Sequence, residues 1–347
     1  MIFSILIPTL NAARTLDECL AHVRAQNFPI SNYEIIIADG GSTDQTRQIA
    51  AKYQASIVEN PLKTGEAGKM VALKHAKGEY VVFLDSDNIL IDPDWLQKMQ
   101  QPFADQDIVA TEPIRYDCRP TDNAMTRYFA YMGMGDPLNY FLGNYDRLCA
   151  INNQWTNIPL PQTASPGFLK VQLDPTKPMP TIGANGFVLR RQLLTTLQSK
   201  DYLFDVDVLH SLSQNQPFHI AKTHTGVVHL FAPNLSTFIR KQQRRVRDYV
   251  YYNSQKARQH SDEDQRNFFL KLLYPGGTNF SGLLFFVLSC VTVIPLVIQM
   301  LRGYLRKPDW VWLLHPLLCE ITVYVYGTER IRSIFKKQLY DRTKWKQ

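Results

Sequence analysis

The sequence predicts an α/β protein in which a mixed, mostly parallel sheet is flanked by helices and followed by C-terminal membrane helices. Over residues 2–84, short β-branched segments alternate with segments of helical periodicity, which is typical of a parallel sheet covered by helices. Residues 280–301 form a long apolar segment without a charged side chain. The 347 residues, 45% of them hydrophobic, are enough for a buried core and exclude a disordered tail.

Strands and helices are expected to alternate along the first part of the chain. The strands are rich in β-branched and aromatic residues and cover residues 2–8, 33–38, 55–59 and 79–84. The helices follow apolar residues at helical spacing and cover residues 15–28, the segment through Ile49 and Tyr53, and residues 69–76. Residues 115–180 show no sustained period, so we expect irregular structure there, and then a tight turn at 183–186 before residues 187–194.

Charge and cysteine content narrow the class of protein. The net charge of +7 divides unevenly, because residues 1–239 carry −4 and residues 240–347 carry +11. The basic residues flank apolar segments, which is typical of membrane flanks, whereas the acidic front region lacks the basic surface of a nucleic-acid-binding protein. The five cysteines form no Cys-x-x-Cys pair, which argues against a zinc cluster or a disulfide framework and favours a cytosol-facing compartment.

The C-terminal region is expected to form a hairpin of two membrane spans. As a helix, residues 280–301 would be about 30 Å long, close to the thickness of a hydrocarbon core. A buried core helix is the alternative for this segment. Residues 310–326 form a second apolar segment that contains Glu320, so an interfacial or re-entrant helix is the alternative there. The basic residues beyond 330 favour a cytosolic C-terminus and a front domain on the cytosolic side.

Acidic residues follow two of the expected strands. Asp39 follows residues 33–38, and Asp85 and Asp87 follow residues 79–84 with one residue between them. Ligands of open α/β sheets lie beyond the carboxyl ends of the strands, so we expect both acidic clusters to line one crevice. Two carboxylates in an extended turn suit Mg²⁺ or Mn²⁺, which would neutralise charge on a departing diphosphate. Two solvated turn aspartates are the alternative.

Three segments carry a resemblance to a known family: SILIPTLN at residues 4–11, EIIIADGGSTD at 34–44 and GEYVVFLDSD at 78–87. In this order they resemble the family 2 nucleotide-sugar glycosyltransferases of the GT-A fold, over residues 2–230. The resemblance implies an inverting transfer of a sugar from a nucleoside diphosphate donor, with Mg²⁺ or Mn²⁺ held at the Asp-x-Asp motif.

The resemblance also implies a donor site at the strand ends. The residues that it assigns to the nucleotide, ribose, diphosphate or metal are Pro8, Thr9, Asn11, Asp39, Lys69, Asp85, Ser86 and Asp87. For Thr9 and Asn11 the alternative is a loop that merely ends a strand, and for Lys69 it is a solvated helix lysine. Ala12 and Gly40 stand where the family often has acidic residues, which leaves the base of the nucleotide undetermined.

Inversion at the sugar carbon requires a base on the acceptor side, within hydrogen-bonding reach of the incoming hydroxyl. Asp207 matches the acidic residue that the family uses for this role, and Asp205 is the second candidate. The alternative is that both are exposed turn residues. By analogy with related enzymes, His229 is expected to join Asp85 and Asp87 as a metal ligand. A structural role is the alternative for this histidine.

A basic segment at residues 240–252 holds Arg244, Arg245 and Arg247 beside several tyrosines. Arginine forms bidentate hydrogen bonds with phosphate, and aromatic residues beside it suit a bilayer interface. We therefore expect a surface helix that binds diphosphate oxygens or anionic lipid headgroups. A solvated basic face is the alternative.

These expectations combine into three regions. Residues 1–232 would form the catalytic domain, with a nucleotide-sugar half at 1–114 and an acceptor half at 115–232; residues 233–274 would be a basic interface segment and 275–347 membrane-associated helices with a basic tail. The expected acceptor is a membrane lipid or lipid-linked group: a polyprenyl-phosphate, a lipid-linked saccharide or a glycolipid. A nucleotidyltransferase acting on a sugar phosphate and a non-catalytic membrane scaffold stay open as alternatives.

Overall fold

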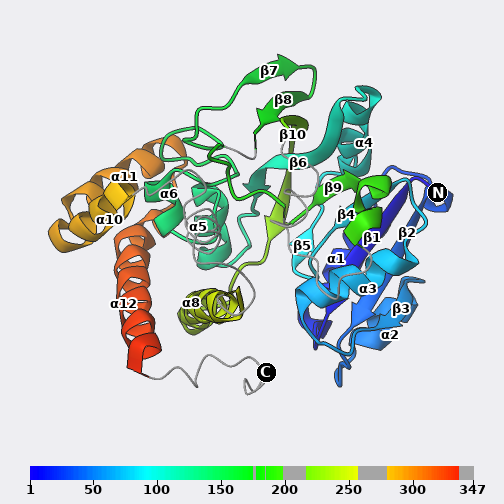
Figure 1. Cartoon of the computed structure of the whole chain (residues 1–347), viewed down its shortest axis with the longest axis horizontal. Helices are drawn as coiled ribbons and strands as arrows, with labels where there is room; N and C mark the ends of the chain where they lie inside the picture. Colours follow the sequence, from blue (N-terminus) through cyan, green and yellow to red (C-terminus); the bar gives the residue numbers. More distant parts are fainter. Residues whose placement is uncertain (175–176, 184, 198–215, 257–279, 336–347) are drawn as a thin grey trace. The chain divides into compact units, whose positions relative to one another are not determined.

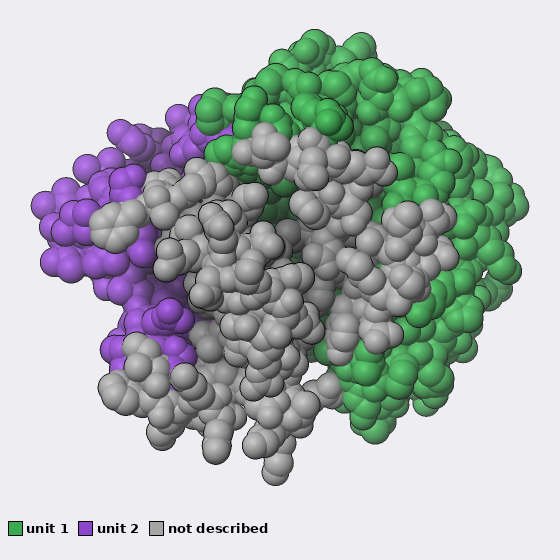
Figure 2. Space-filling view, viewed as in Figure 1, with its two compact units in different colours: residues 1–119, 159–230 green, residues 120–158, 231–347 purple. Residues whose placement is uncertain are grey.

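The computed structural model describes residues 1–174, 177–183, 185–197, 216–256 and 280–335 (Figure 1). The chain divides into two compact units, coloured separately in Figure 2. Unit 1 comprises Met1–Arg119 and Pro159–Leu230, and unit 2 comprises Pro120–Ile158 and Phe231–Gln347. The units are thus interleaved in sequence, whereas the regions expected from the sequence are contiguous.

Unit 1 is built on one sheet with the strand order β3-β2-β1-β4-β9-β6-β10-β8-β7, and β5 pairs with β10. The strands are β1 (Phe3–Thr9), β2 (Tyr33–Asp39), β3 (Ser56–Glu59), β4 (Tyr80–Phe83), β5 (Asn88–Ile89), β6 (Ile108–Asp117), β7 (Gln162–Ser165), β8 (Phe168–Leu173), β9 (Phe187–Arg190) and β10 (Phe218–His229). The strands expected at residues 2–8, 33–38, 55–59 and 79–84 correspond to β1, β2, β3 and β4.

The sheet is mixed, but parallel pairs do not predominate as expected. Within the described residues, β1–β2, β1–β4, β2–β3 and β6–β10 are parallel, and five other pairs are antiparallel. The antiparallel pairs arise because β9 runs back between β4 and β6, and because β7 and β8 form a hairpin beside β10. The first four strands have the expected parallel arrangement.

The helices of unit 1 are α1 (Ala13–Arg24), α2 (Thr46–Lys52), α3 (Gly65–His75) and α4 (Trp95–Gln100), with 3₁₀ turns η1 (Ile30–Asn32), η2 (Gln101–Ala104) and η3 (Arg191–Leu197). Helix α3 begins before residue 69, where it was expected, because the Thr64 side chain caps it by accepting a hydrogen bond from the Ala67 amide. Helix α1 ends at Arg24, so Phe28 packs from the following loop against the core.

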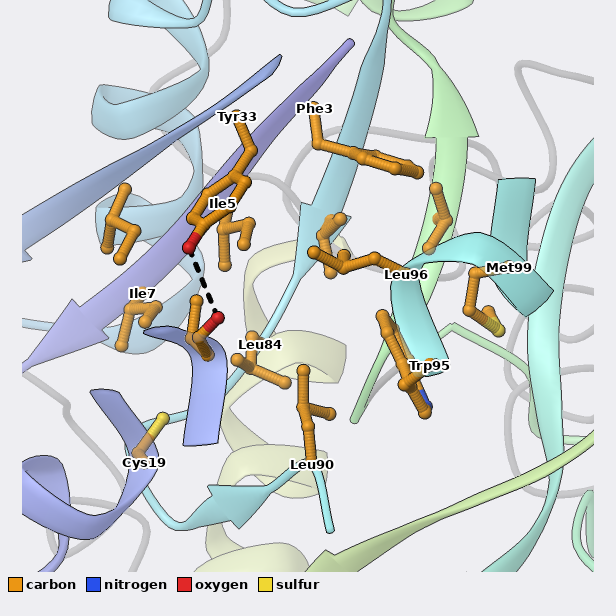
Figure 3. Close-up of a cluster of buried hydrophobic side chains, with 14 of the residues drawn as sticks. Phe3, Ile5, Ile7, Cys19, Tyr33, Leu84, Leu90, Trp95, Leu96 and Met99 are labelled. Carbon is orange, nitrogen blue, oxygen red and sulfur yellow. Dashed lines mark hydrogen bonds between the residues drawn. The ribbon is translucent and has the colours of Figure 1, made fainter. Parts of the chain in front are cut away.

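The core of unit 1 lies between the first strands and helices α1 and α4, and Figure 3 shows part of it, including Phe3, Ile5 and Ile7 of β1. The Tyr33 hydroxyl donates a 3.3 Å hydrogen bond to the Val23 carbonyl, which ties β2 to α1. This packing holds the carboxyl ends of the strands in fixed positions, and the predicted site residues follow those ends.

Unit 2 is helical in its described residues, with α5 (Ala124–Met132), α6 (Leu138–Leu142), α8 (Leu235–Lys256), α10 (Phe280–Thr292), α11 (Ile294–Arg306), η4 (Trp310–Leu313) and α12 (Leu314–Phe335). The expectation of irregular structure over residues 115–180 is wrong, because that segment contains α5, α6, β7 and β8. Helix α5 is fixed by local signals: Asn123 caps its start, and Gly133 ends it with a φ of 70°.

The continuous helix expected over residues 280–301 is wrong. Helix α10 ends at Thr292, Val293 has a φ of 61°, and Pro295 lies in the first turn of α11, so the two helices meet at 94°. Proline has no amide hydrogen and cannot continue the hydrogen bonding of α10. Among the described helices none has by itself the length and apolar composition of a membrane span, and the bent pair α10–α11 has them jointly.

Candidate functional site

The carboxyl ends of β1 and β2 are joined through Asp39. Thr9 and Asp39 are partners in the parallel register, and the Thr9 hydroxyl donates a 3.2 Å hydrogen bond to Asp39 Oδ1. The Ser42 hydroxyl and amide donate to the two Asp39 oxygens at 2.5 and 3.1 Å, and Arg47 Nε lies 3.4 Å from Oδ2. Asp39 is fully buried, so its structural task is to fix both loops. Its contact with a nucleotide base stays a prediction.

Asn11 locks the loop after β1 to the loop after β2. It has a φ of 50°, a conformation that asparagine tolerates better than most residues. The Asn11 side-chain oxygen accepts a 2.9 Å hydrogen bond from the backbone amide of Thr43, and the backbone amide of Asn11 donates to the Ser42 hydroxyl at 2.8 Å. Pro8, Thr9, Asn11 and Asp39 therefore lie together at the ends of β1 and β2, and their contact with a nucleotide stays a prediction.

Lys69 is buried on α3, with 8% of its surface exposed. Its Nζ lies 5.8 Å from the centroid of the Phe83 ring, near the end of β4. The alternative of a solvated helix lysine is therefore wrong. Helix α3 approaches β1 closely at Gly68, where an added Cβ would lie 2.7 Å from Pro8 Cβ. This close approach keeps Lys69 beside the strand that leads to Asp85.

Asp85, Ser86 and Asp87 form a turn after β4 and are partly exposed. The turn is closed by two hydrogen bonds with Asn88: its amide donates to the Asp85 carbonyl at 3.0 Å, and its side-chain oxygen accepts from the Asp85 amide at 3.1 Å. The thiol of Cys19 lies behind the turn, 3.9 Å from the Asp85 carbonyl. Burial, and then the charges of Asp87 and Asp85, raise the pKa of this thiol, so it stays protonated.

His229 lies beside Asp87 because β10 pairs with β5. In that antiparallel register His229 is opposite Asn88, and the Leu230 amide donates a 2.9 Å hydrogen bond to the Asp87 carbonyl. His229 Nε2 lies 3.6 Å from Asp87 Oδ2, and both side chains are partly exposed. The structure thus brings together two residues that are 142 positions apart and that were both expected at a metal.

The Asp87–His229 pair fits a divalent cation. A carboxylate oxygen and an imidazole nitrogen at this separation can both reach one ion, and Mn²⁺ accepts both kinds of donor. In the part of the chain that the structure describes, no group of three or more His, Cys, Asp or Glu side chains is arranged for a metal. Remaining positions would therefore belong to water and to oxygens of a bound phosphate.

Three residues beside the Asp87–His229 pair were not predicted from the sequence: Asn88, Asn185 and Tyr116. The Asn88 side chain donates to Asp87 Oδ1 at 3.3 Å and to Asn185 Oδ1 at 3.0 Å, and Asn185 donates to the Tyr116 hydroxyl at 3.0 Å. The Tyr116 and His229 rings lie 5.7 Å apart between centroids. These contacts close a ring around the Asp87–His229 pair. Two signals were present in the sequence: the position of Asn88 directly after the acidic motif, and Asn185 in the turn at 183–186.

The other predicted site residues lie elsewhere in the chain. Asp205 and Asp207, the expected bases, are outside the described residues. Arg244, Arg245 and Arg247 are on α8 in unit 2. Arg245 Nη1 lies 3.4 Å from Asp136 Oδ2 and donates a 2.7 Å hydrogen bond to the Gly135 carbonyl. Arg247 binds the buried Glu329 through two hydrogen bonds of 3.1 and 3.2 Å, so contact of these arginines with phosphate stays a prediction.

Residues 4–159 match the model of the family described as glycosyl transferase family 2. This segment includes the strands β1 to β4 and the acidic turn after β4. The match covers less than half of the chain and includes the three motifs on which the resemblance to this family rests. The expected α/β architecture, a mixed sheet flanked by helices, is confirmed by the structure.

Two curated relatives match short segments of the chain. The poly(ribitol-phosphate) beta-N-acetylglucosaminyltransferase TarS of Staphylococcus aureus is 38% identical over 96 residues, which are 26% of this chain and 17% of that protein. The UDP-Glc:alpha-D-GlcNAc-diphosphoundecaprenol beta-1,3-glucosyltransferase WfgD of Escherichia coli is 35% identical over 92 residues, which are 25% of this chain and 36% of that protein. The matches thus span less than half the length of either relative.

Two solved structures are similar over most of the chain. The mannosyltransferase PcManGT from Pyrobaculum calidifontis, in complex with GDP-Man and Mn²⁺, has a TM-score of 0.49 and 15% identity over 94% of this chain and 86% of that one. TarS 1–349 from S. aureus, in complex with UDP, has a TM-score of 0.44 and 18% identity over 96% of this chain and 92% of that one.

Proposed function

We propose that the chain transfers a sugar, with inversion, from a nucleoside-diphosphate-sugar donor to a membrane-associated acceptor, with help from a divalent cation. The observation that carries this proposal is the approach of His229 Nε2 to Asp87 Oδ2, 3.6 Å, at the turn after β4. The turn lies at the same edge of the sheet as the hydrogen-bonded Thr9–Asp39 pair, because β1 is parallel to both β2 and β4. A cation site at the same sheet edge as the fixed loops after β1 and β2 suits the binding of a nucleoside diphosphate.

Each residue has a defined task in this proposal. Asp87 and His229 hold the cation, which when bound would neutralise the charge that develops on the leaving diphosphate. Pro8, Thr9, Asn11 and Asp39 hold the nucleoside, and Asp85 and Ser86 lie in the same turn as Asp87. The buried ammonium of Lys69 adds positive charge near the end of β4. Asp207, with Asp205 beside it, accepts the proton of the acceptor hydroxyl.

The membrane-associated acceptor is supported by the C-terminal region. Its basic residues flank apolar helices, and α10 and α11 together have the apolar composition of a broken span. The name of the E. coli relative specifies a diphosphoundecaprenol acceptor, which makes a lipid-linked acceptor our first choice here. The positive charge beyond residue 330 favours the cytosolic side for the catalytic unit.

The full chain, purified in detergent, is incubated with a panel of nucleotide sugars and Mn²⁺ or Mg²⁺. We expect slow release of nucleoside diphosphate that needs the metal and that falls at least 100-fold in Asp87→Asn and His229→Ala. Asp107→Asn is the matched control, because that carboxylate in unit 1 is 71% exposed and should leave the rate unchanged. Metal-independent release at the wild-type rate in Asp87→Asn would refute the metal site.

A second arm tests transfer and the alternatives. Lipid extracts of membranes are added as acceptors, and a new glycolipid is sought by mass spectrometry. Asp207→Asn should lower turnover while donor binding is retained. Release of pyrophosphate instead of nucleoside diphosphate would indicate a nucleotidyltransferase. Donor binding without any turnover would indicate a non-catalytic scaffold.

A further inference from the structure

Helix α11 presents an apolar stripe to the surface of unit 2. The side chains of this stripe are between 37% and 80% exposed and recur every three or four residues: Ile294, Val297, Ile298, Leu301, Tyr304 and Leu305. The opposite, buried face carries Leu296, Gln299 and Gly303. A helix on a water-exposed surface normally has the reverse pattern, with its apolar side chains facing the core.

Two contacts fix α11 in this orientation. The Gln299 side-chain oxygen lies 2.8 Å from Nε2 of the buried His315, within hydrogen-bonding distance. At Gly303 the helix backbone meets the Trp312 ring so closely that an added Cβ would lie 2.6 Å from it. Rotation of α11 about its axis would break the hydrogen bond and drive a side chain into Trp312. The outward direction of the stripe is therefore built into the packing of unit 2.

The helices on either side extend the apolar surface. Helix α10 packs on α6 and α12, yet five of its apolar side chains are 39–75% exposed: Leu284, Phe285, Val287, Leu288 and Val291. Leu313 and Leu317, at the start of the last helical segment, are 66% and 48% exposed. Apolar patches of this extent are uncommon on monomeric soluble proteins and mark a surface that something covers.

The charged residues of α10 and α11 are all basic. Residues 281–308 include no acidic side chain, and the cations among them, Arg302, Arg306 and Lys307, are exposed at the C-terminal end of α11. Tyr304, near the end of α11, is 49% exposed, and Trp310, which follows Asp309, is 58% exposed. An apolar stripe with cations and amphipathic aromatic residues at one end is complementary to a bilayer with anionic headgroups.

We propose that the α10–α11 apolar face, residues 284–305 with their exposed apolar side chains, inserts into the surface of a bilayer that contains anionic lipid. Arg302, Arg306 and Lys307 then lie at the level of the headgroups. This inference rests on the proposed function only for the choice of a membrane as partner, because the exposure and the charges are properties of unit 2 alone. It names the surface through which the enzyme would reach a lipid-linked acceptor.

The test is co-flotation of the full chain with vesicles of neutral phosphatidylcholine or of phosphatidylcholine with phosphatidylglycerol, after removal of detergent. We expect binding to be strongest with the anionic lipid and to fall on the order of tenfold or more in Ile294→Glu and in Arg302→Gln with Lys307→Gln. Ile30→Glu is the matched control, because Ile30 in unit 1 is 61% exposed and Ile294 is 68% exposed. Both positions are on the surface, so both variants should fold.

Equal binding to neutral and anionic vesicles, or undiminished binding of Ile294→Glu, would overturn the inference. A stable dimer in solution that Ile294→Glu dissociates would also overturn it, because a second copy of the chain would then cover the apolar face. Donor hydrolysis is measured on the same samples. Vesicle binding without hydrolysis by the wild-type chain would remove the proposed function and leave the docking surface in place. Hydrolysis with no vesicle binding would do the opposite.

Discussion

The Asn88 side chain donates a 3.0 Å hydrogen bond to the side-chain oxygen of Asn185, which is 97 residues further along the chain. Both residues are buried, Asn88 completely. The bond ties the acidic turn after β4 to the turn before β9. Because Asn88 also donates to Asp87, this pair holds one of the proposed metal ligands in a fixed direction.

We predict that Asn88→Ala weakens Mn²⁺ binding on the order of 10- to 100-fold, as the loss of a residue that orients a metal ligand usually does. The measurement is a Mn²⁺ titration followed by electron paramagnetic resonance, which needs neither a donor nor turnover. Asn27→Ala is the control, because its side chain makes a comparable 2.8 Å hydrogen bond to Asp94 on the surface of unit 1. Equal Mn²⁺ affinity in the wild type and Asn88→Ala would contradict the positioning role.

The sequence predicted the half of the site that depends on local patterns. The apolar strands that lead to Asp39 and Asp85 could be identified because period, composition and turn residues are all local. Asn185 and Tyr116 could not be identified in the same way, because their role depends on β9 and β6 being neighbours. That neighbourhood arises from antiparallel returns in the sheet, which no local pattern encodes.

The C-terminal region illustrates the opposite difficulty. Residues 280–301 are uniformly apolar, so composition predicted one straight helix. The break between α10 and α11 depends on the left-handed backbone of Val293 and on Pro295. Pro295 could be seen in the sequence, whereas the conformation of Val293 could not. Likewise the pairing of Arg247 with Glu329 could not be predicted from the sequence, because the two residues are 82 positions apart.

Gly68 offers a test of the contact between α3 and β1. We predict that Gly68→Ala destabilises the chain by about 1–3 kcal/mol, because the new Cβ would lie 2.7 Å from Pro8 Cβ and 3.0 Å from Asn60 Nδ2. It should also weaken donor binding, since Pro8 would be displaced. Gly65→Ala on the same helix is the control: its Cβ meets nothing within 4 Å, so it should be neutral or stabilising by at most about 1 kcal/mol. Urea unfolding and donor titration of both variants measure the two effects, and equal behaviour of the variants would disprove the contact.

Glu112 and Lys222 form a fully buried ion pair between β6 and β10, with Nζ 2.6 Å from Oε2. Removal of one partner leaves a buried charge without its counter-ion, so Lys222→Met should cost about 3–5 kcal/mol of unfolding free energy. The double variant Glu112→Leu/Lys222→Met should recover much of this loss, because no charge then remains buried. Lys52→Met, at an ion pair with Asp17 in which both side chains are at least half exposed, should cost less than about 1 kcal/mol. A double variant no more stable than Lys222→Met would rule out this account.

Glu329 makes the stability of unit 2 depend on pH. Burial acts to raise the pKa of its carboxyl group, but hydrogen bonds and charge from Arg247, and then from Arg332, outweigh burial and hold it below the ordinary value of 4.5. A carboxyl group with a lowered folded-state pKa contributes stability above the unfolded-state pKa, and the contribution disappears as the pH falls through the folded-state value.

Arg247→Leu should therefore lower the thermal midpoint at pH 7 and have a much smaller effect once the pH is well below 4.5. Calorimetry of the full chain at both pH values gives the comparison, with Arg332→Leu, whose side chain is 56% exposed, as the milder variant. A loss of midpoint in Arg247→Leu that is the same at both pH values would mean that Arg247 stabilises α8 by packing alone, since packing does not depend on the charge of Glu329.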